Sequence, residues 1–213
     1  MNFIRPSTFI DINEYDYIVS IGNKCPTAMI LRDLNIYKES FPFDYIPTTP
    51  SLILKYLDDQ TDFYPKKNTI LNKDKVWFGH FDINEKYEET IKTFRRRFDR
   101  LFEALRNNKK ILFVYTSEAD IYNEMNNRYN NNYDDLTRII SYIIDKYDYH
   151  TFTVAAIHIN KEFINTRNLI NYTITVPEKY LSDDKSTHTS EIWTEYRTIL
   201  KSLFKEIFLL MRQ

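Results

Sequence analysis

Two kinds of hydrophobic pattern alternate along this chain: short apolar runs, and longer segments in which apolar residues recur every three or four positions. The short runs are rich in β-branched and aromatic residues and have the length of buried strands. They lie at residues 16–22, 110–115, 152–157 and 172–176. The first run ends at Gly22, and Pro26 follows where it can begin a helix. The chain is therefore predicted to open with a strand, a tight turn and a helix.

The longer segments predict amphipathic helices. The clearest covers residues 85–106, and we expect one of its faces to pack on the sheet through Ile91, Phe94, Phe98, Leu101 and Leu105. Further helices are predicted after Pro26 and Pro50 and over residues 136–144 and 191–210. The helix that follows Pro26 is expected to carry the apolar residues Ala28, Met29, Leu31 and Leu34 on one side.

Strands that alternate with helices at this spacing are typical of a mainly parallel sheet with helices on both of its faces. At 213 residues the chain fits one domain with a core of its own. The sequence therefore predicts a single α/β domain over residues 1–213. We expect three layers, with a mainly parallel sheet of about four or five strands between two layers of helices.

Composition excludes several classes of protein. The 29 Lys and Arg residues nearly balance the 30 Asp and Glu residues, so no bulk charge favours a nucleic acid or an anionic membrane. No apolar stretch reaches the roughly 18 residues needed to cross a bilayer, and the first residues lack the apolar run of a signal peptide. The single cysteine excludes internal disulfides. We therefore expect an intracellular, cytoplasmic protein, in the host cytoplasm if its source is viral, and its oligomeric state stays open.

Glycine is the residue whose scarcity says most about this chain. At average frequency a chain of this length would hold about fifteen glycines, whereas this one holds two, Gly22 and Gly79. Such rare glycines mark a backbone conformation closed to other residues, or the close approach of another group. Gly22 stands shortly before the only cysteine, Cys25, and Gly79 directly precedes His80. Both glycines thus stand beside side chains suited to nucleophilic catalysis.

Cys25 is the candidate nucleophile. Ligands of α/β sheets bind outside the carboxyl ends of the strands, and we expect Cys25 at the end of a central strand and the start of the helix that contains Pro26. The helix dipole favours the thiolate there, and backbone N–H groups of the turn at Gly22 and Asn23 could stabilise an oxyanion. The alternative is that Cys25 is a small buried apolar side chain, as lone cysteines often are.

His80 is the candidate general base for Cys25, because histidine is the usual partner of a cysteine nucleophile. Asp44 and Asp82 are the carboxylates that could orient its imidazole, and spacing does not choose between them. The alternative is a histidine that merely packs in a loop with Trp77, Phe78 and Phe81. No paired Cys/His spacing predicts a metal site, and no cofactor is expected. No catalytic role is expected for the other histidines, which lie in or beside polar segments: His150, His158 and His188.

One basic cluster lies on the predicted helix at residues 85–106. Arg96 and Arg100 share a helix face, while Arg95 and Arg97 diverge from it. This face is either a solvated surface, or one that contacts an anionic substrate or pairs with a carboxylate. Both interpretations stay open at this point.

Six short motifs lie at residues 18–25, 41–45, 78–80, 94–100 and 111–114 and at Trp193. Their order resembles that of a family of papain-like cysteine peptidases, a domain of unknown function found in bacteria and in large DNA viruses. The resemblance covers nearly the whole chain, although Tyr45 stands where that family typically has Trp. It implies that Cys25 is the nucleophile, His80 the base and Asp44 a third member of the site.

Three functions follow as hypotheses. The first is a cysteine-dependent hydrolase, peptidase-like or acyl-transferring, that uses Cys25 and His80 on a peptide, acyl or glycan substrate. The second is a non-catalytic binding module, of viral origin or not, that keeps the cleft of the peptidase family but not its activity. The third is a sugar- or phosphate-handling protein that holds an anion with the Arg95 to Arg100 face and the first strand-helix turn. That turn lacks the glycine-rich signatures of nucleotide-binding loops.

Overall fold

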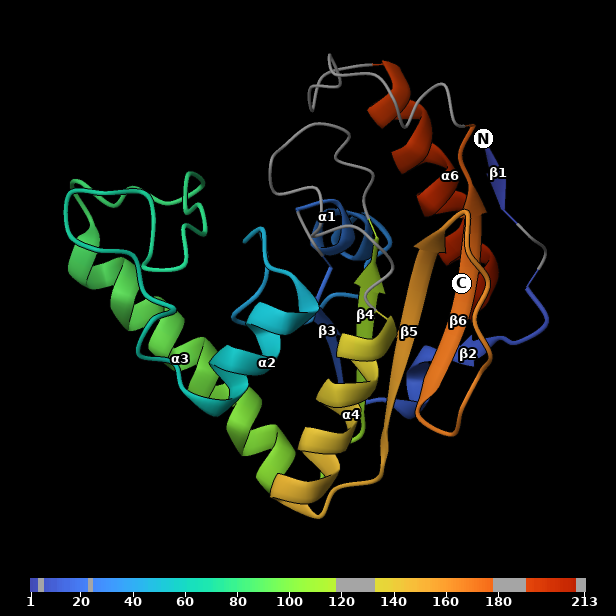
Figure 1. Cartoon of the computed structure of the whole chain (residues 1–213), viewed down its shortest axis with the longest axis horizontal. Coiled ribbons are helices and arrows are strands. Elements are labelled where there is room, and N and C mark those ends of the chain that lie inside the picture. The colour runs from blue at the N-terminus through green and yellow to red at the C-terminus, as the bar shows by residue number, and fades with distance from the viewer. Residues whose placement is uncertain (4–5, 23–24, 118–132, 178–190, 210–213) are drawn as a thin grey trace.

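A five-stranded, mostly parallel sheet forms the middle layer of the molecule (Figure 1). The computed structural model describes residues 1–3, 6–22, 25–117, 133–177 and 191–209. The strand order is β1-β6-β5-β4-β3, in which β1 pairs antiparallel with β6 and the other neighbours pair in parallel. The strands are β1 (Asn2–Phe3), β3 (Tyr17–Ser20), β4 (Ile111–Thr116), β5 (Phe152–Ile159) and β6 (Leu169–Thr175).

Helices cover both faces of this sheet. Alternate strand residues point to opposite faces, so Phe113 packs in the core with α3 and α4, whereas Leu112 packs in the core with α1 and α6. The three-layer α/β fold predicted from the sequence is thus confirmed. One layer holds α2 (Pro50–Asp58), α3 (Tyr87–Arg106) and α4 (Tyr133–Tyr147), and the other holds α1 (Cys25–Asp33) and α6 (Glu191–Ile207).

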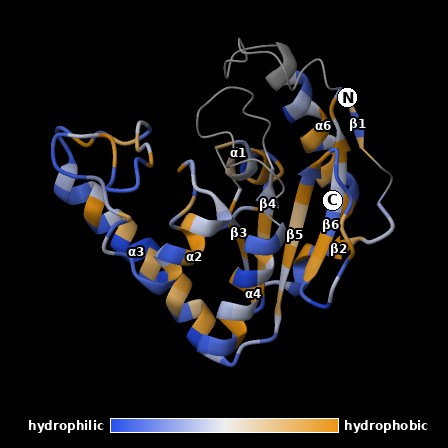
Figure 2. Ribbon diagram, viewed as in Figure 1, coloured by the Kyte–Doolittle hydropathy of each residue, from blue (hydrophilic) through white to orange (hydrophobic). Residues whose placement is uncertain are grey.

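The hydropathy of the elements follows their place in these layers. Figure 2 shows strands β4 and β5 as largely hydrophobic, and every residue of β4 is buried. The helices α3 and α4 carry hydrophilic and hydrophobic residues on different sides, as expected for helices with one buried face. A second, two-stranded parallel sheet joins β2 (Ile10–Asp11) to β7 (Phe208–Leu209), and a short 3-10 helix, Ile12–Glu14, follows β2. None of the described helices combines the length and the apolar character needed to cross a membrane.

The position of β3 in the sheet corrects one expectation. We expected Cys25 to follow a central strand, but β3 is the edge strand. Each later parallel strand, β4, β5 and β6, is added on the same side of the one before it, so the first strand stays at the edge. At the opposite edge, β1 pairs with β6 over only two residues, too few for a hydrophobic period to predict it.

The buried face of α1 also differs from expectation. Ala28 and Leu31 are buried as predicted, but Ile30 takes the place expected for Met29, which is 44% exposed. The buried residues Thr27, Ile30 and Leu31 recur at spacings of three and four and define the side that packs on the sheet. Met29 therefore lies on the outer side of this helix.

The apolar face of α3 is buried as predicted, but much of it packs on loops. Its two central rings, Phe94 and Phe98, lie 5.2 and 4.8 Å from the ring of Phe63. Phe43 and Phe78 contact the same ring edge-on, at 6.2 and 5.4 Å. We call these five residues the aromatic cluster. Because Phe43 precedes Asp44 and Phe78 stands just before Gly79 and His80, the aromatic cluster positions both loops that carry predicted site residues.

Candidate functional site

The structure brings Cys25 and His80 into direct contact. The Cys25 Sγ atom lies 3.0 Å from His80 Nε2, across a sequence separation of 55 residues. Cys25 is the first residue of α1 and is half-buried, whereas His80 belongs to the irregular segment before α3 and is exposed. The distance is within the reach required of a thiol and its general base.

Two aromatic rings flank the imidazole. The ring of Trp77 lies 5.4 Å from that of His80 and the ring of Tyr45 lies 6.1 Å from it, both edge-on. The thiol of Cys25 also faces the Tyr45 carbonyl oxygen, at 3.9 Å. Tyr45 has a φ of 61°, a left-handed conformation that is uncommon for a residue other than glycine. The surrounding contacts therefore hold Tyr45 in an unfavourable backbone conformation beside both Cys25 and His80.

Close approach explains both glycines. A Cβ atom on Gly79 would lie 1.8 Å from the Trp77 ring, and one on Gly22 would lie 2.0 Å from Thr27 Oγ1. Neither glycine has a positive φ. Gly79 thus lets Trp77 lie against the backbone beside His80. Gly22 lets α1 pack closely on the strand that precedes it.

Of the two predicted oxyanion donors, Gly22 and Asn23, the structure describes Gly22. Gly22 is buried and packs against Thr27. The Thr27 hydroxyl hydrogen-bonds to the hydroxyl of Thr116 on β4. Asn23 lies outside the described residues. A role for these two backbone positions in oxyanion binding therefore stays a prediction.

Asp44 and Asp82 are not brought to His80. Asp44 is fully buried, and its Oδ2 accepts hydrogen bonds from the Phe41 N–H, at 2.6 Å, and from the Tyr37 hydroxyl. Asp82 accepts from the Glu85 N–H at 3.1 Å, just before α3. Among the described residues neither carboxylate hydrogen-bonds to His80. Asp44 instead fixes the turn that presents Tyr45.

The charges of three arginines act on the buried carboxylate of Asp44. Arg97 has the largest effect of the three, and sequence analysis gave it no role. Burial raises the pKa of Asp44 to about 7, although the Phe41 N–H and the charges of Arg97, Arg32 and Arg100 act to lower it. Burial also lowers the pKa of Arg97, whose guanidinium lies 5.2 Å from the ring of Phe94. Both shifts have the same first cause, so desolvation outweighs the attraction between the two charges. Asp44 Oδ1, Arg97 Nε and Arg97 Nη1 are buried without a hydrogen-bond partner among the described residues.

The two arginines predicted to contact an anion have different surroundings. Arg100 donates to the Ser40 carbonyl oxygen at 2.6 Å and forms an ion pair with Glu39 at 3.0 Å. Arg96 is exposed. The guanidinium of Arg100 is thus already occupied within the protein, and a role for this pair in anion binding stays a prediction.

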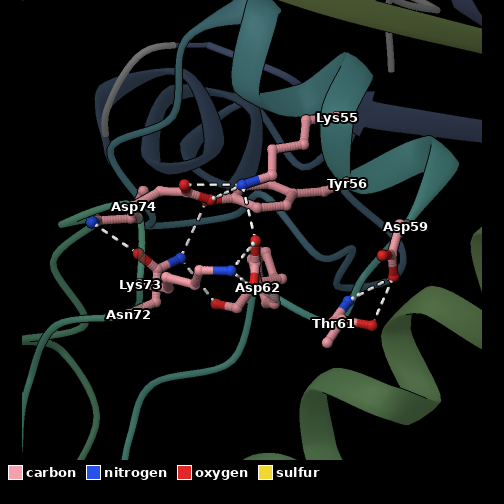
Figure 3. Close-up of polar contacts among 10 residues, drawn as sticks. Lys55, Tyr56, Asp59, Thr61, Asp62, Asn72, Lys73 and Asp74 are labelled. Atoms are coloured by element: carbon pink, nitrogen blue, oxygen red, sulfur yellow. Dashed lines mark hydrogen bonds and ion pairs between the residues drawn. The ribbon is translucent and has the colours of Figure 1, made fainter.

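A polar network ties α2 to the segment that leads to His80 (Figure 3). Lys55 Nζ lies 3.0 Å from the Asp62 carboxylate and 2.7 Å from that of Asp74. The Tyr56 hydroxyl donates to Asp74 Oδ2 at 2.8 Å. These contacts join one turn of α2 to both ends of the loop over residues 62–74.

Asn72 belongs to this network and is buried (Figure 3). Its amide donates to the Tyr56 hydroxyl at 3.0 Å and to the Phe63 carbonyl at 2.9 Å, and its Oδ1 accepts from the Val76 N–H at 2.9 Å. One side chain therefore joins α2, the aromatic cluster and the segment that enters the site. No sequence signal distinguishes it from the other asparagines of this Asn-rich chain.

Replacing Asn72 by alanine is expected to lower the free energy of unfolding by about 2 to 3 kcal/mol, because the Val76 N–H and the Phe63 carbonyl lose their buried partner. Urea denaturation measures the change. Asn84→Ala, which removes an exposed amide, serves as the control and should stay within about 0.5 kcal/mol of the parent. Equal unfolding free energies for the two variants would contradict the role given to Asn72.

The other histidines lie away from the site or outside the described residues. His158 is buried within β5 rather than in a polar loop, and its Nε2 lies 2.9 Å from Asn171 Oδ1. Burial lowers the pKa of His158 to about 4. His188 and the side chain of Trp193 are not described. In the part of the chain that the structure describes, no three His, Cys, Asp or Glu side chains are grouped to hold a metal ion.

Comparison with known proteins adds no assignment. No protein-family model matches the chain, and neither a curated protein nor a solved structure matches it.

Proposed function

We propose that this protein is a cysteine-dependent hydrolase or acyl-transfer enzyme, with Cys25 as nucleophile and His80 as general base. The observation that carries the proposal is the 3.0 Å distance between Cys25 Sγ and His80 Nε2. The position of Cys25 at the first residue of α1 supports it, because a helix N-terminus stabilises a thiolate. The flanking rings of Trp77 and Tyr45 support it further by limiting how far the imidazole can turn.

The proposed reaction begins with a proton transfer. His80 Nε2 takes the proton of the Cys25 thiol, and the thiolate attacks the carbonyl carbon of the substrate. The bond to the leaving group then breaks, and the imidazolium gives its proton to that group. Water then attacks the resulting thioester while the same imidazole takes its proton, and the bond between the acyl carbon and Sγ breaks. The imidazolium returns the proton to Sγ, so the products are the carboxylic acid and the free thiol. An acceptor other than water turns the same steps into acyl transfer.

Asp44 has a positioning role in this proposal. Its hydrogen bond from the Phe41 N–H closes the turn whose next residue, Tyr45, contacts Cys25 and His80. The catalytic pair is therefore Cys25 and His80, and Asp44 acts through Tyr45. This differs from a triad in which a carboxylate bonds directly to the histidine.

Alkylation by iodoacetamide tests the pair without knowledge of the substrate. We expect the pKa of the Cys25 thiol to lie below the value of about 8.5 for a free cysteine thiol. At pH 6 to 7 Cys25 should therefore be alkylated faster than a free thiol. His80→Ala should slow alkylation about tenfold in this range, because the thiol loses the partner that takes its proton. The rate constant is measured between pH 5 and 9 by mass spectrometry, which reports modification at the only cysteine.

The matched control is His150→Ala, which removes an exposed histidine and should leave the rate unchanged. Two results together would overturn the proposal: an apparent pKa of the Cys25 thiol at or above the value of a free thiol, and an alkylation rate constant that His80→Ala does not change. The binding-module hypothesis would then be the better one.

A further inference from the structure

Large exposed apolar side chains gather on the two segments that meet at the candidate site. Met29 on α1 and Ile70, Leu71 and Trp77 before His80 are each between 40 and 44% exposed. The two remaining large apolar side chains that are exposed among the described residues, Phe9 and Ile164, lie on other segments. A soluble protein leaves single apolar side chains exposed without consequence, but a group of them marks a binding surface.

Three of these side chains share a local face with the thiol or with the ring that contacts the imidazole. Met29 stands four residues after Cys25 on α1, so the two share a helix face one turn apart. Trp77 contacts the His80 ring at 5.4 Å. Leu71 forms an antiparallel bridge with Trp77, and side chains paired across such a bridge lie on the same side of the backbone. We call Met29, Leu71 and Trp77 the apolar rim.

We propose that the apolar rim binds an apolar acyl group of the substrate. This inference rests on the proposed function, and it names the class of substrate that the site would accept. In a cysteine hydrolase the acyl group becomes bonded to Sγ, so it must lie within a few bond lengths of Cys25. Around that position Met29 offers apolar surface on the Cys25 side, and Trp77 and Leu71 offer it on the His80 side.

Gly79 adds a further observation in favour of this surface. Its missing side chain lets the Trp77 ring lie against the backbone next to His80, where a Cβ atom would lie 1.8 Å from the ring. The ring is thus held beside the imidazole and leaves 42% of its residue surface in solvent. A rigid, half-exposed aromatic surface of this kind binds apolar groups at a low entropic cost.

The test compares two reagents that alkylate the same thiol. Each rate constant for Cys25, with iodoacetamide or with N-hexyl iodoacetamide, is divided by that of the same reagent with N-acetylcysteine. We expect the hexyl reagent to be favoured about tenfold, which corresponds to burial of about two methylene groups. Trp77→Ala and Leu71→Gln, made separately, should each reduce this preference to about threefold or less.

Phe9→Ala is the matched control, because it removes a ring that is 49% exposed elsewhere on the surface. It should keep the tenfold preference. A parent preference near one, or a preference that neither rim variant reduces, would overturn the inference. So would a dimer that Trp77→Ala converts to a monomer, since the apolar rim would then be a contact between two copies of the chain.

The two proposals fail in different ways. If His80→Ala leaves the iodoacetamide rate unchanged while the hexyl preference persists, the catalytic proposal fails and the apolar rim remains as a binding surface. If alkylation depends on His80 but the hexyl reagent has no advantage, only the substrate class is wrong. Independently of these outcomes, a p-nitrophenyl ester series from acetate to hexanoate measures the same preference in turnover. If the apolar rim binds the acyl group, hexanoate should have the higher kcat/KM.

Discussion

Replacing Phe98 by alanine is expected to lower the free energy of unfolding by about 3 to 5 kcal/mol, because a fully buried ring is lost and a cavity remains. The ring lies 4.8 Å from that of Phe63 and 5.8 Å from that of Phe43, both edge-on. These contacts join α3 to the loop before α2 and to the loop after it. The loss is a large share of the 5 to 15 kcal/mol that stabilises a typical domain, roughly a third.

The matched control lies one turn further along the same helix. Phe102 stacks on Phe98 with a ring separation of 5.8 Å but is only partly buried. Phe102→Ala should therefore cost clearly less than Phe98→Ala in urea melts at the same pH. Equal costs would show that the aromatic cluster does not carry the stability assigned to it.

The fold was predictable where one period runs through a long segment. The face of α3 and the buried runs at β4 and β5 follow from spacing alone, because packing on a core imposes that spacing. The position of β3 at the edge could not be read in this way, since no local pattern says on which side the next strand is added. The same holds for β1, whose pairing with β6 depends on a contact between residues at opposite ends of the chain.

Arg97 shows what sequence analysis of the site missed. It stands three residues after Phe94 and four before Leu101, on the edge of the apolar face, and this spacing was the available signal for burial. The spacing of four residues between Arg96 and Arg100 instead singled out those two arginines, because it places them on one helix face. The structure puts Arg97 against Phe94 and close enough to Asp44 for their charges to interact.

The sequence pointed to Cys25 and His80 as partners, but it could not establish that they touch. Residues separated by 55 positions meet only if the loops between them fold in a particular way, and no spacing rule describes that. The two glycines were the useful signal, because in this chain each permits a close contact next to a site residue. The resemblance to a peptidase family pointed to the same two residues, together with Asp44.

Asp44 is expected to make the protein less stable as the pH rises from about 4 to about 7. Burial raises the pKa of Asp44 from 3.8 to about 7, so in this range the folded protein keeps a proton that the unfolded chain has released. Stability falls with pH wherever the folded state binds more protons than the unfolded state. A difference of about 3 pH units, at about 1.4 kcal/mol each, makes the decline from this group about 4 kcal/mol.

Asp44→Asn tests this directly, because its amide resembles the protonated carboxyl and does not titrate. Relative to the parent, the variant should gain stability between pH 4 and pH 7.5 in urea melts, by up to about 4 kcal/mol. Asp145→Asn, at an exposed carboxyl on α4, is the control and should keep a nearly constant difference from the parent. If Asp44→Asn instead loses stability as the pH rises, the carboxylate is ionised in the folded protein. The attraction of Arg97 would then outweigh the cost of burial, and the site would rest on a buried ion pair.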